Sequence, residues 1–578
     1  MTALDIAARS VLAKLEGGNF ARRLWERDPS LWKAEPEHQR IIKNALGWLS
    51  VPETMLAALD SLQQFVEEVR GEGFKHAVVL GMGGSSLCPD VCRATFGTSP
   101  GFLDLHVLDS TIPAVITQVE KSIDLPKTLF LVSSKSGGTV EPLSFYAYFR
   151  QRVEQVRGAG AGENFVAVTD PGTSLESLAR EKRFRRVFYG QPDIGGRYSA
   201  LSNFGMAPAA LAGVDVRKLL GRAVEMAQAC AAAKPLEENP GVALGALLAE
   251  AARAGRDKLT FVMSPGIYTF ADWVEQLLAE STGKEGKGLV PVVREYINPP
   301  ECYGSDRVFI HMTLSSEVNE TVQKRLEVLE AAGHPVVRIQ LADRYDLGKE
   351  FFRWEVAAAT AGALLGINSF DQPNVQESKD NTNRLLAQHR AQGQFEEGAP
   401  AAEYQCVKVF CPAQLYTKFQ EKLRVREGLS PAELVGAFLE EGKAGSYVAL
   451  LPYLESFSGH KAAIQAMRLG IRDALRLATT VGYGPRYLHS TGQLHKGGAA
   501  NGLFILITAD DRHDLPVPGQ PYTFSVLKQA QALGDFQALA SRGRPVLRFH
   551  LGTTIRAGLD SLASLVKAAL SKLQNISG

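Results

Sequence analysis

The chain has 578 residues, of which 45% are hydrophobic and 22% charged, a balance typical of globular proteins. Its 63 basic and 62 acidic residues leave a net charge of +1, so nothing indicates nucleic-acid binding and any anion site must be local. We find neither a secretory leader nor an apolar run of about 18 residues, and we expect a cytoplasmic protein with no membrane partner.

Six cysteines are present. The pairs Cys88–Cys92 and Cys406–Cys411 have no neighbouring histidines in the pattern of a zinc site. We therefore expect ordinary thiols in a reducing compartment, with no metal and no cofactor.

The first 215 residues divide into a helical and an alternating part. Residues 1–70 have the apolar spacing of helices, clearest at 61–70. In residues 71–215, short apolar runs end in polar or glycine-rich turns and alternate with helical stretches such as Pro142–Gln155. This alternation predicts a parallel, doubly wound sheet. Its expected strands are His76–Leu80, Asp104–Leu108, Thr128–Val132 and Asn164–Val168.

Two further α/β units are expected. Residues 216–390 begin with helical sequence to about Ala254 and continue with strands at Lys258–Ser264, Arg307–Met312 and Pro335–Leu341. Residues 391–403 have the composition of a polar linker. The third unit, 404–578, has expected strands at Gln405–Phe410, Ser446–Leu451, Leu503–Thr508 and Pro545–Leu551.

The third unit resembles the second. Leu329–Ile339 and Leu539–Phe549 share the order helix end, glycine, basic residue, proline, strand. We interpret the third unit as a degenerate repeat of the second. The alternative is the spacing that all parallel α/β units share.

Two turns carry groups suited to an anion. Gly81–Ser86 (G-M-G-G-S-S) follows the first strand, where glycines allow a ligand to approach the backbone; it lacks the later glycine of a dinucleotide fingerprint. Ser133–Thr139 (S-S-K-S-G-G-T) joins the third strand to a helix. Its hydroxyls and the free N–H groups of the helix predict a phosphate cradle. The alternative for Thr139 is a simple helix cap.

Three later segments make the resemblance to a family specific. They are Gly195–Ser199 (G-G-R-Y-S), Gln276–Lys284 (Q-L-L-A-E-S-T-G-K) and Asp371–Lys379 (D-Q-P-N-V-Q-E-S-K). With the two turns, these motifs resemble in order those of the phosphoglucose isomerase family. The resemblance implies tandem doubly wound sugar isomerase (SIS) domains with flanking helices, followed here by a third related α/β module.

The resemblance also implies roles for individual residues. Glu280 matches the general base, which moves a proton between C1 and C2 through a cis-enediolate. Arg197 matches the arginine beside the reacting carbons, and Lys379 the lysine near the ring oxygen. The implied substrate-binding residues are Gly84, Ser85, Ser134, Lys135, Ser136, Thr139, Gln276 and Gln372.

This chain lacks the histidine of the family at its usual position in the sequence. The family has it between the E-S-x-G-K and D-Q segments, where this chain offers only His311 and His334 in other contexts. The best match is His489, in Y-L-H-S-T-G-Q of the third unit, with His495 in reserve. In the family this histidine comes from the neighbouring subunit, so we expect the third unit to supply it in cis. The alternative is a surface histidine.

One alignment of the repeat bears on this expectation. If Leu278–Glu280 corresponds to Leu477–Thr479, the third unit has lost the carboxylate and kept the histidine.

The implied reaction is the interconversion of glucose 6-phosphate and fructose 6-phosphate. The alternatives are an enzyme that also accepts mannose 6-phosphate, and a noncatalytic phosphosugar-binding regulator. The order of the late motifs also resembles the isomerase half of fused transaldolase–isomerase proteins, but the chain has no room for a barrel of about 250 residues, so we expect it to stand alone. The family forms homodimers, a requirement that a histidine in cis would loosen.

Overall fold

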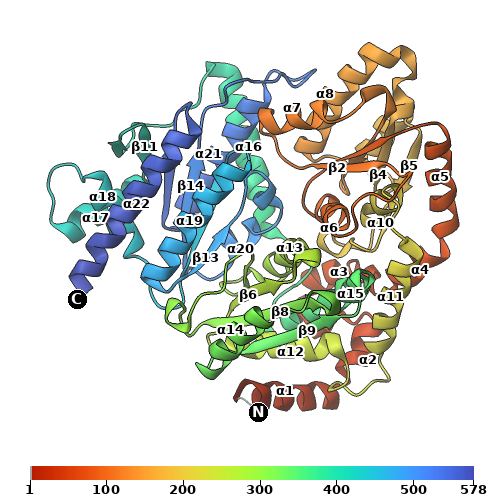
Figure 1. Ribbon diagram of the computed structural model, residues 1–578, viewed down its shortest axis with the longest axis horizontal. Helices are drawn as coiled ribbons and strands as arrows, with labels where there is room; N and C mark the ends of the chain where they lie inside the picture. Colours follow the sequence, from red (N-terminus) through yellow and green to blue (C-terminus); the bar gives the residue numbers. More distant parts are fainter. Residues whose placement is uncertain (1–2, 578) are drawn as a thin grey trace.

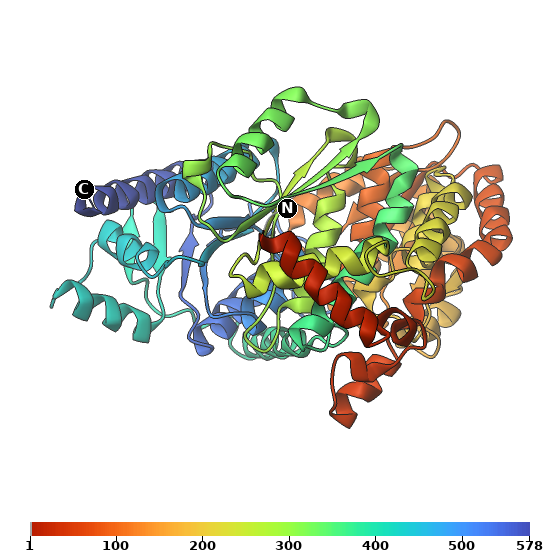
Figure 2. The same cartoon turned by 90° about the horizontal axis from the view of Figure 1, so that it is seen from below.

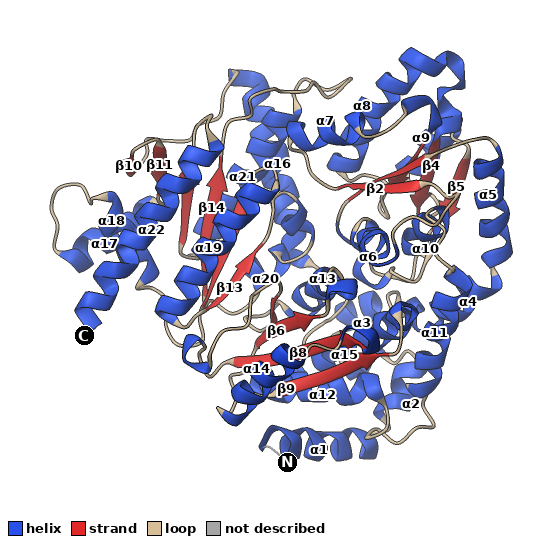
Figure 3. Cartoon of the chain, viewed as in Figure 1, coloured by secondary structure: helices blue, strands red, loops and turns tan. Residues whose placement is uncertain are grey.

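The computed structural model describes residues 3–577 and contains three separate sheets. Two sheets are wholly parallel and the third is mixed, with helices packed around all of them (Figure 3). The predicted α/β fold class is confirmed. Figure 1 shows the three α/β units grouped around a common centre, where helix α13 (Phe270–Thr282) contacts both α6 (Leu87–Phe96) and α20 (Gly492–Gly497). None of the helices between Ala3 and Ser577 is both long and apolar enough to cross a membrane.

The N-terminal segment is helical, as its spacing predicts. Its α-helices are α1 (Ala3–Gly17), α2 (Phe20–Trp25), α3 (Pro36–Lys43), α4 (Val51–Ala57) and α5 (Leu59–Gly71). Figure 2 shows α1 lying along the second unit, where it packs on α12 (Pro240–Arg253). Buried Trp32 donates its indole N–H to the carbonyl of Ala359 at 2.8 Å. A continuous apolar core from Leu12 to Phe370 therefore joins this segment to the first two sheets.

The first sheet has the order β2-β1-β3-β4-β5, and all of its strands are parallel. The strands are β1 (His76–Gly81), β2 (Asp104–Leu108), β3 (Thr128–Ser133), β4 (Phe165–Thr169) and β5 (Arg186–Tyr189). The helices are α6 (Leu87–Phe96), α7 (Pro113–Lys121), α8 (Val140–Arg157), α9 (Ser174–Glu181) and α10 (Asn203–Leu211). The four expected strands match the structure to within one residue. The sequence did not reveal β5, because it is a four-residue edge strand of which only Phe188 is buried.

The second sheet has the order β7-β6-β8-β9 and is also parallel. The strands are β6 (Lys258–Met263), β7 (Val290–Val292), β8 (Arg307–Leu314) and β9 (Val336–Leu341), and the remaining helices are α11 (Val216–Ala229), α13 (Phe270–Thr282), α14 (Glu320–Ala331) and α15 (Leu347–Leu365). The helical stretch expected from 216 to 254 is two helices. A new helix begins after Asn239, whose side chain accepts the backbone N–H of Val242 at 3.0 Å.

The third sheet has the order β10-β11-β15-β14-β12-β13. Its strands are β10 (Ala402–Tyr404), β11 (Val407–Phe410), β12 (Tyr447–Tyr453), β13 (Ala478–Val481), β14 (Gly502–Thr508) and β15 (Val546–His550). Its helices are α16 (Pro373–Gln392), α17 (Ala413–Leu423), α18 (Pro431–Leu439), α19 (Ser458–Leu475), α20 (Gly492–Gly497), α21 (Phe524–Ser541) and α22 (Ile555–Ser577). The parallel strands β13-β12-β14-β15 follow the same order as β7-β6-β8-β9. The predicted repeat requires such a shared order.

Two details of the third unit differ from the sequence interpretation. The suggested counterpart of Glu280 is wrong, because Thr479 lies on strand β13 whereas Glu280 lies on helix α13. Helix α16 packs on α21 through Leu385, Ala530 and Leu533. The predicted boundary at residue 390 thus separates α16 from the helix that it contacts.

A buried charge cluster joins the second and third units. The carboxylate of Glu295, which follows β7, lies 3.0 Å from Arg307 of β8. Two arginines of α19 in the third unit face the same carboxylate, Arg472 at 3.8 Å and Arg468 at 4.0 Å. All four side chains are at most 1% exposed. One carboxylate therefore compensates positive charge from both sides of the junction.

Replacing Glu295 with Gln should lower the free energy of unfolding by about 3–5 kcal/mol, because it leaves the buried arginines without their anion. Denaturant titration of the full chain measures this loss. The matched control is Glu330→Gln, which breaks a surface pair with Arg338 in which both side chains are 45% exposed, and it should change stability by no more than about 1 kcal/mol. Equal stability of both variants would contradict a junction that depends on Glu295.

Candidate active site

The two predicted anion-binding turns lie next to each other at one edge of the first sheet. Strands β1 and β3 are neighbours, and Gly81 at the end of β1 pairs with Ser133 at the end of β3. The sheet extends from β1 in both directions, through β2 on one side and β3 on the other. Such a reversal of strand order at the carboxyl edge is where open α/β sheets bind ligands.

The turn after β1 holds the three units in contact. Gly83 has a φ of +55°, and a Cβ there would lie 2.6 Å from the carbonyl oxygen of His489 and 2.9 Å from Nε2 of Gln276. A Cβ on Gly84 would lie 2.0 Å from the carbonyl oxygen of Gly196. The glycines therefore allow backbone contact with the segments that carry Arg197 and His489. Ser85 is buried within the same turn.

The turn after β3 brings hydroxyl groups to the start of helix α8. The hydroxyl of Ser134 donates to that of Thr139 at 3.0 Å, and Ser136 is exposed. Thr139 occupies the N-cap position of α8 but makes no side-chain cap hydrogen bond, so simple capping does not explain it. The free N–H groups of the 18-residue helix point toward this turn.

The ammonium of Lys135, in the same turn, contacts acceptors of the protein itself and does not face the turn as a simple anion-binding group. Its ammonium lies 2.5 Å from the carboxylate of Asp170 and 2.7 Å from the carbonyl of Gln191. Burial lowers the pKa of Lys135, and Asp170 opposes that effect. Its side chain therefore fixes the turn against β4.

Glu280 lies in the last turn of α13, a helix buried on every side. Its carboxylate is 5% exposed, 3.4 Å from Nη1 of Arg197, and accepts from Nε2 of Gln276 at 3.3 Å. Burial raises the pKa of Glu280, while Arg197 and Gln276 lower it. A helix C-terminus also disfavours negative charge. The result is a dry carboxylate with a raised proton affinity.

Arg197 is fixed by contacts with the second unit. Its Nε donates to Ser281 at 2.9 Å, and Nη2 donates to the carbonyls of Ser369 and Asp371. Lys284 donates to the side chain of Asp371 at 2.7 Å. Burial and nearby Arg197 lower the pKa of Lys284 to about 7, against the opposing effect of Asp371. Arg197 and Lys284 thus anchor the D-Q segment beside Glu280.

His489 of the third unit lies at this same centre. Its carbonyl accepts from Nε2 of Gln276 at 2.9 Å, and its ring Nε2 is 2.8 Å from Oε1 of Glu141. The side chain is 16% exposed. The structure therefore brings His489 to Gln276 and Glu280 within one chain. The amide oxygen of Gln276 is buried without a hydrogen-bond partner among the described residues, which leaves an acceptor at the site.

Glu141 is the residue that the sequence interpretation missed. It lies in the first turn of α8, where an acidic residue ordinarily balances the helix dipole. Here it accepts from Gln531 at 2.6 Å, and Gln531 accepts from Thr111 at 3.0 Å. Burial raises the pKa of Glu141, but contact with His489 and other groups lowers it overall. The carboxylate of Glu141 therefore orients the imidazole of His489.

The segment around His489 is held by contacts with the first unit and by contacts within the third unit. Arg486 lies 3.2 Å from Asp109 and 3.5 Å from Asp90 of the first unit. Within the third unit, Tyr487 donates to buried Asp535 at 2.5 Å. His495, the reserve candidate, is fully buried beside aromatic rings such as Tyr487, and burial lowers its pKa far below the usual value. It does not join the site.

The two remaining candidates lie at the border of the site. Gln372 is exposed at the start of α16, directly after Asp371, and Lys379 is exposed about two turns further on. Lys379 is near enough to Glu141 to contribute to its lowered pKa. Neither residue contacts Glu280 in this arrangement of the described residues.

The comparisons with known proteins point to one family. A model of the family described as phosphoglucose isomerase matches residues 39–291. A glucose-6-phosphate isomerase of Carboxydothermus hydrogenoformans is 30% identical over 404 residues, which cover 60% of this chain and 85% of that protein. That of Rubrobacter xylanophilus is 28% identical, over 64% of this chain and 94% of that protein.

One solved structure shares the fold. A hypothetical protein from Thermus thermophilus superposes with a TM-score of 0.56 at 26% identity, over 66% of this chain and 97% of that chain. The family match ends at residue 291, before the D-Q segment and the third sheet. The placement of Lys379 and His489 therefore rests on the geometry described above.

Replacing Gly83 with Ala should destabilise the junction of the three units. A left-handed backbone costs an L-residue about 1–2 kcal/mol, and the new Cβ would displace the carbonyl of His489. The free energy of unfolding measures the loss. Gly221→Ala is the control, because it lies in α11 with open space around it and should gain up to about 1 kcal/mol. If Gly83→Ala unfolds like the wild type, the close contact at Gly83 does not exist in solution.

Proposed function

Because this chain belongs to the phosphoglucose isomerase family, we propose that it interconverts glucose 6-phosphate and fructose 6-phosphate, with Glu280 as the base. The observation that carries this proposal is the buried carboxylate of Glu280 between Arg197 and Gln276. A noncatalytic regulator needs no such base. The expectation of an isomerase is confirmed by the family, whereas acceptance of mannose 6-phosphate stays a prediction.

The phosphate of the substrate binds at the turn after β3. Ser134, Ser136 and Thr139 supply hydroxyls, and the N-terminus of α8 supplies N–H groups and a favourable dipole. Lys135 contributes through its backbone, since its ammonium is engaged by Asp170. Gly84, Ser85 and Gln372 border the sugar. Binding energy from the phosphate then holds C1 and C2 near Glu280.

Proton transfer needs only one carboxylate. Glu280 removes the proton from C2 of the open-chain aldose, the C–H electrons form the C1–C2 double bond, and negative charge develops on O1. A proton passes from O2 to O1, the C2 carbonyl forms, and Glu280 returns its proton to C1. Arg197 stabilises the enediolate charge. The raised pKa of Glu280 suits both the removal and the return of the proton.

Ring opening precedes this step. It requires an acid at the ring oxygen and a base at the anomeric hydroxyl. His489 and Lys379 share these roles, and Glu141 orients the imidazole of His489. Because His489 comes from the same chain as Glu280, the site does not depend on a second subunit. A homodimer and a cytoplasmic location both stay predictions.

Glu280→Gln should reduce the exchange of solvent deuterium into C1 of fructose 6-phosphate by about 10³-fold, because an amide cannot accept the proton. Proton NMR in deuterium oxide follows the exchange directly. Exchange by this variant at the wild-type rate would remove Glu280 from the mechanism.

Glu275→Gln is the matched control for Glu280→Gln. Glu275 lies on the same helix, and burial together with Asp272 raises its pKa to about 8. It is therefore neutral at pH 7, where glutamine resembles it, and activity should persist.

The acid limb of kcat/KM in the wild type should fall at a pH above 4.5, the ordinary pKa of glutamate, because Glu280 must lose its proton to act.

His489→Asn should slow the turnover of cyclic glucose 6-phosphate by about 10²–10³-fold. It should leave the isomerisation of 5-deoxyfructose 6-phosphate nearly unchanged, because that ketose cannot close the furanose ring. Steady-state kinetics with both substrates separates ring opening from proton transfer.

Two variants complete the comparison. Glu280→Gln should lose activity on both substrates, and His513→Asn, which changes an exposed histidine, should lose it on neither. If His489→Asn lost activity equally on both substrates, that result would contradict a role of His489 in ring opening.

A further inference from the structure

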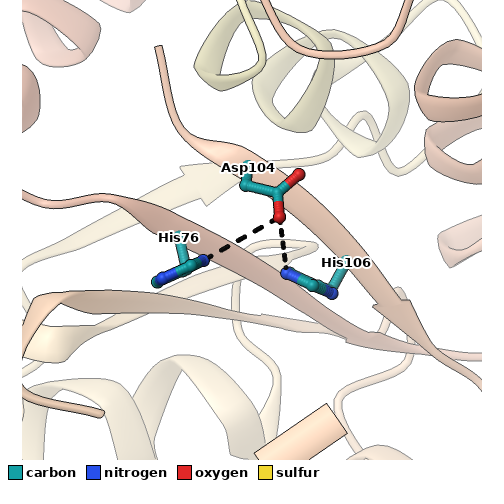
Figure 4. A group of neighbouring side chains, drawn as sticks. All are labelled: His76, Asp104 and His106. Carbon is teal, nitrogen blue, oxygen red and sulfur yellow. Dashed lines mark ion pairs between the residues drawn. The ribbon is translucent and has the colours of Figure 1, made fainter. Parts of the chain in front are cut away.

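Two histidines and an aspartate converge at the opposite edge of the first sheet from the candidate active site. Figure 4 shows His76, Asp104 and His106 facing one another on β1 and β2. Oδ2 of Asp104 lies 3.1 Å from Nε2 of His106 and 4.0 Å from Nδ1 of His76. One ligand atom from each residue lies within 4.8 Å of the others.

The register of the two strands produces this arrangement. His76 is directly opposite Asp104, and Val78 is opposite His106. Side chains two residues apart on a strand lie on the same face, so Asp104 and His106 project together beside His76. Backbone pairing at the amino ends of two strands therefore fixes the group in place.

The hydrogen bonds around the group leave ligand atoms free. Thr98 donates to Oδ1 of Asp104 at 3.3 Å, which leaves Oδ2 facing the imidazoles. Within residues 3–577, the enclosed atoms Nδ1 of His76 and Nε2 of His106 have no hydrogen-bond partner. An ordinary histidine–aspartate hydrogen bond would satisfy His106 and still leave His76 unpaired.

We propose that His76, Asp104 and His106 bind a divalent transition-metal ion of the Zn²⁺ class. Two neutral imidazoles and a carboxylate are ligands that such ions prefer. In a tetrahedral site with bonds of about 2.0–2.1 Å, ligand atoms lie about 3.3 Å apart, a value between the 3.1 Å and 4.0 Å separations here. Closing the site requires the imidazole of His76, now 4.0 Å from Oδ2 of Asp104, to move closer. Asp104 is 57% exposed, so water completes the coordination.

The proposed ion would act on stability and not on the reaction. His76 begins β1 and the glycine turn follows its end at Gly81, so at about 3.3 Å per residue the ion lies roughly 17–20 Å from that turn. Strand β2 is at the edge of the sheet and pairs only with β1 among the described strands. The ion would fasten this edge strand to its neighbour. The proposed metal site differs from the prediction made from the sequence, which includes no metal.

The test uses the full chain stripped of metal with a chelator and titrated with Zn²⁺ by calorimetry. We expect one site that His76→Ala, His106→Ala and Asp104→Asn each abolish, and a thermal midpoint that rises with the logarithm of the Zn²⁺ concentration. Thr98→Val should weaken the affinity about 10–100-fold, because Thr98 orients the carboxylate. Isomerase turnover of the wild type should not change with Zn²⁺ bound.

Two controls account for other ligands on the surface. His513→Ala and Cys406→Ser remove an exposed histidine and an exposed thiol, and both should keep the site. If His106→Ala fails to fold, Asp104→Asn decides, because it retains the size of the side chain. Absence of Zn²⁺ binding by the wild type, or unchanged binding by His106→Ala or Asp104→Asn, would overturn the proposal.

Discussion

The burial of the Glu280 carboxylate is the constraint on which the rest of the structure depends. Removing a carboxylate from water is costly unless charges and hydrogen bonds compensate for it. Arg197 and Gln276 supply that compensation only in part, at 3.4 Å and 3.3 Å, so the pKa of Glu280 stays raised. This balance suits a group that must take up and release a proton. It also requires that the segments around α13 exclude water and hold their positions.

Those segments come from three units, and three contacts at the centre each cross between two of them. Arg197 of the first unit reaches Glu280 of the second, Gln276 of the second reaches His489 of the third, and His489 reaches Glu141 of the first. Such a ring of contacts keeps its geometry only if the units cannot slide. The buried cluster around Glu295 fixes the second unit to the third, and the ion pairs of Arg486 fix the third to the first. These contacts hold the third unit, which carries His489, against both of the others.

Much of the fold could be predicted because long apolar strands and glycine-rich turns have local signals. Strands β1 to β4 of the first sheet are examples. Short strands gave no such signal: β7 has three residues, one of them proline, and β13 has four.

The roles of Glu141 and Lys135 also depend on distant partners. Glu141 contacts a residue 348 positions away and Lys135 one 35 positions away, and a single sequence does not show which residues the fold brings together. His489 was predicted only through its motif, and its contacts come from the structure alone.

The central claim is that one chain supplies both the base and the histidine. The most direct measurement is to co-express Glu280→Gln with His489→Ala, isolate the mixed assembly, and assay isomerase turnover. If each site is built in cis, every site in the mixture lacks one of the two groups, and activity should equal that of the single variants. If His489 crossed between subunits, a mixed pair would contain one site with both groups intact. Recovery of activity well above that of either variant would contradict the account.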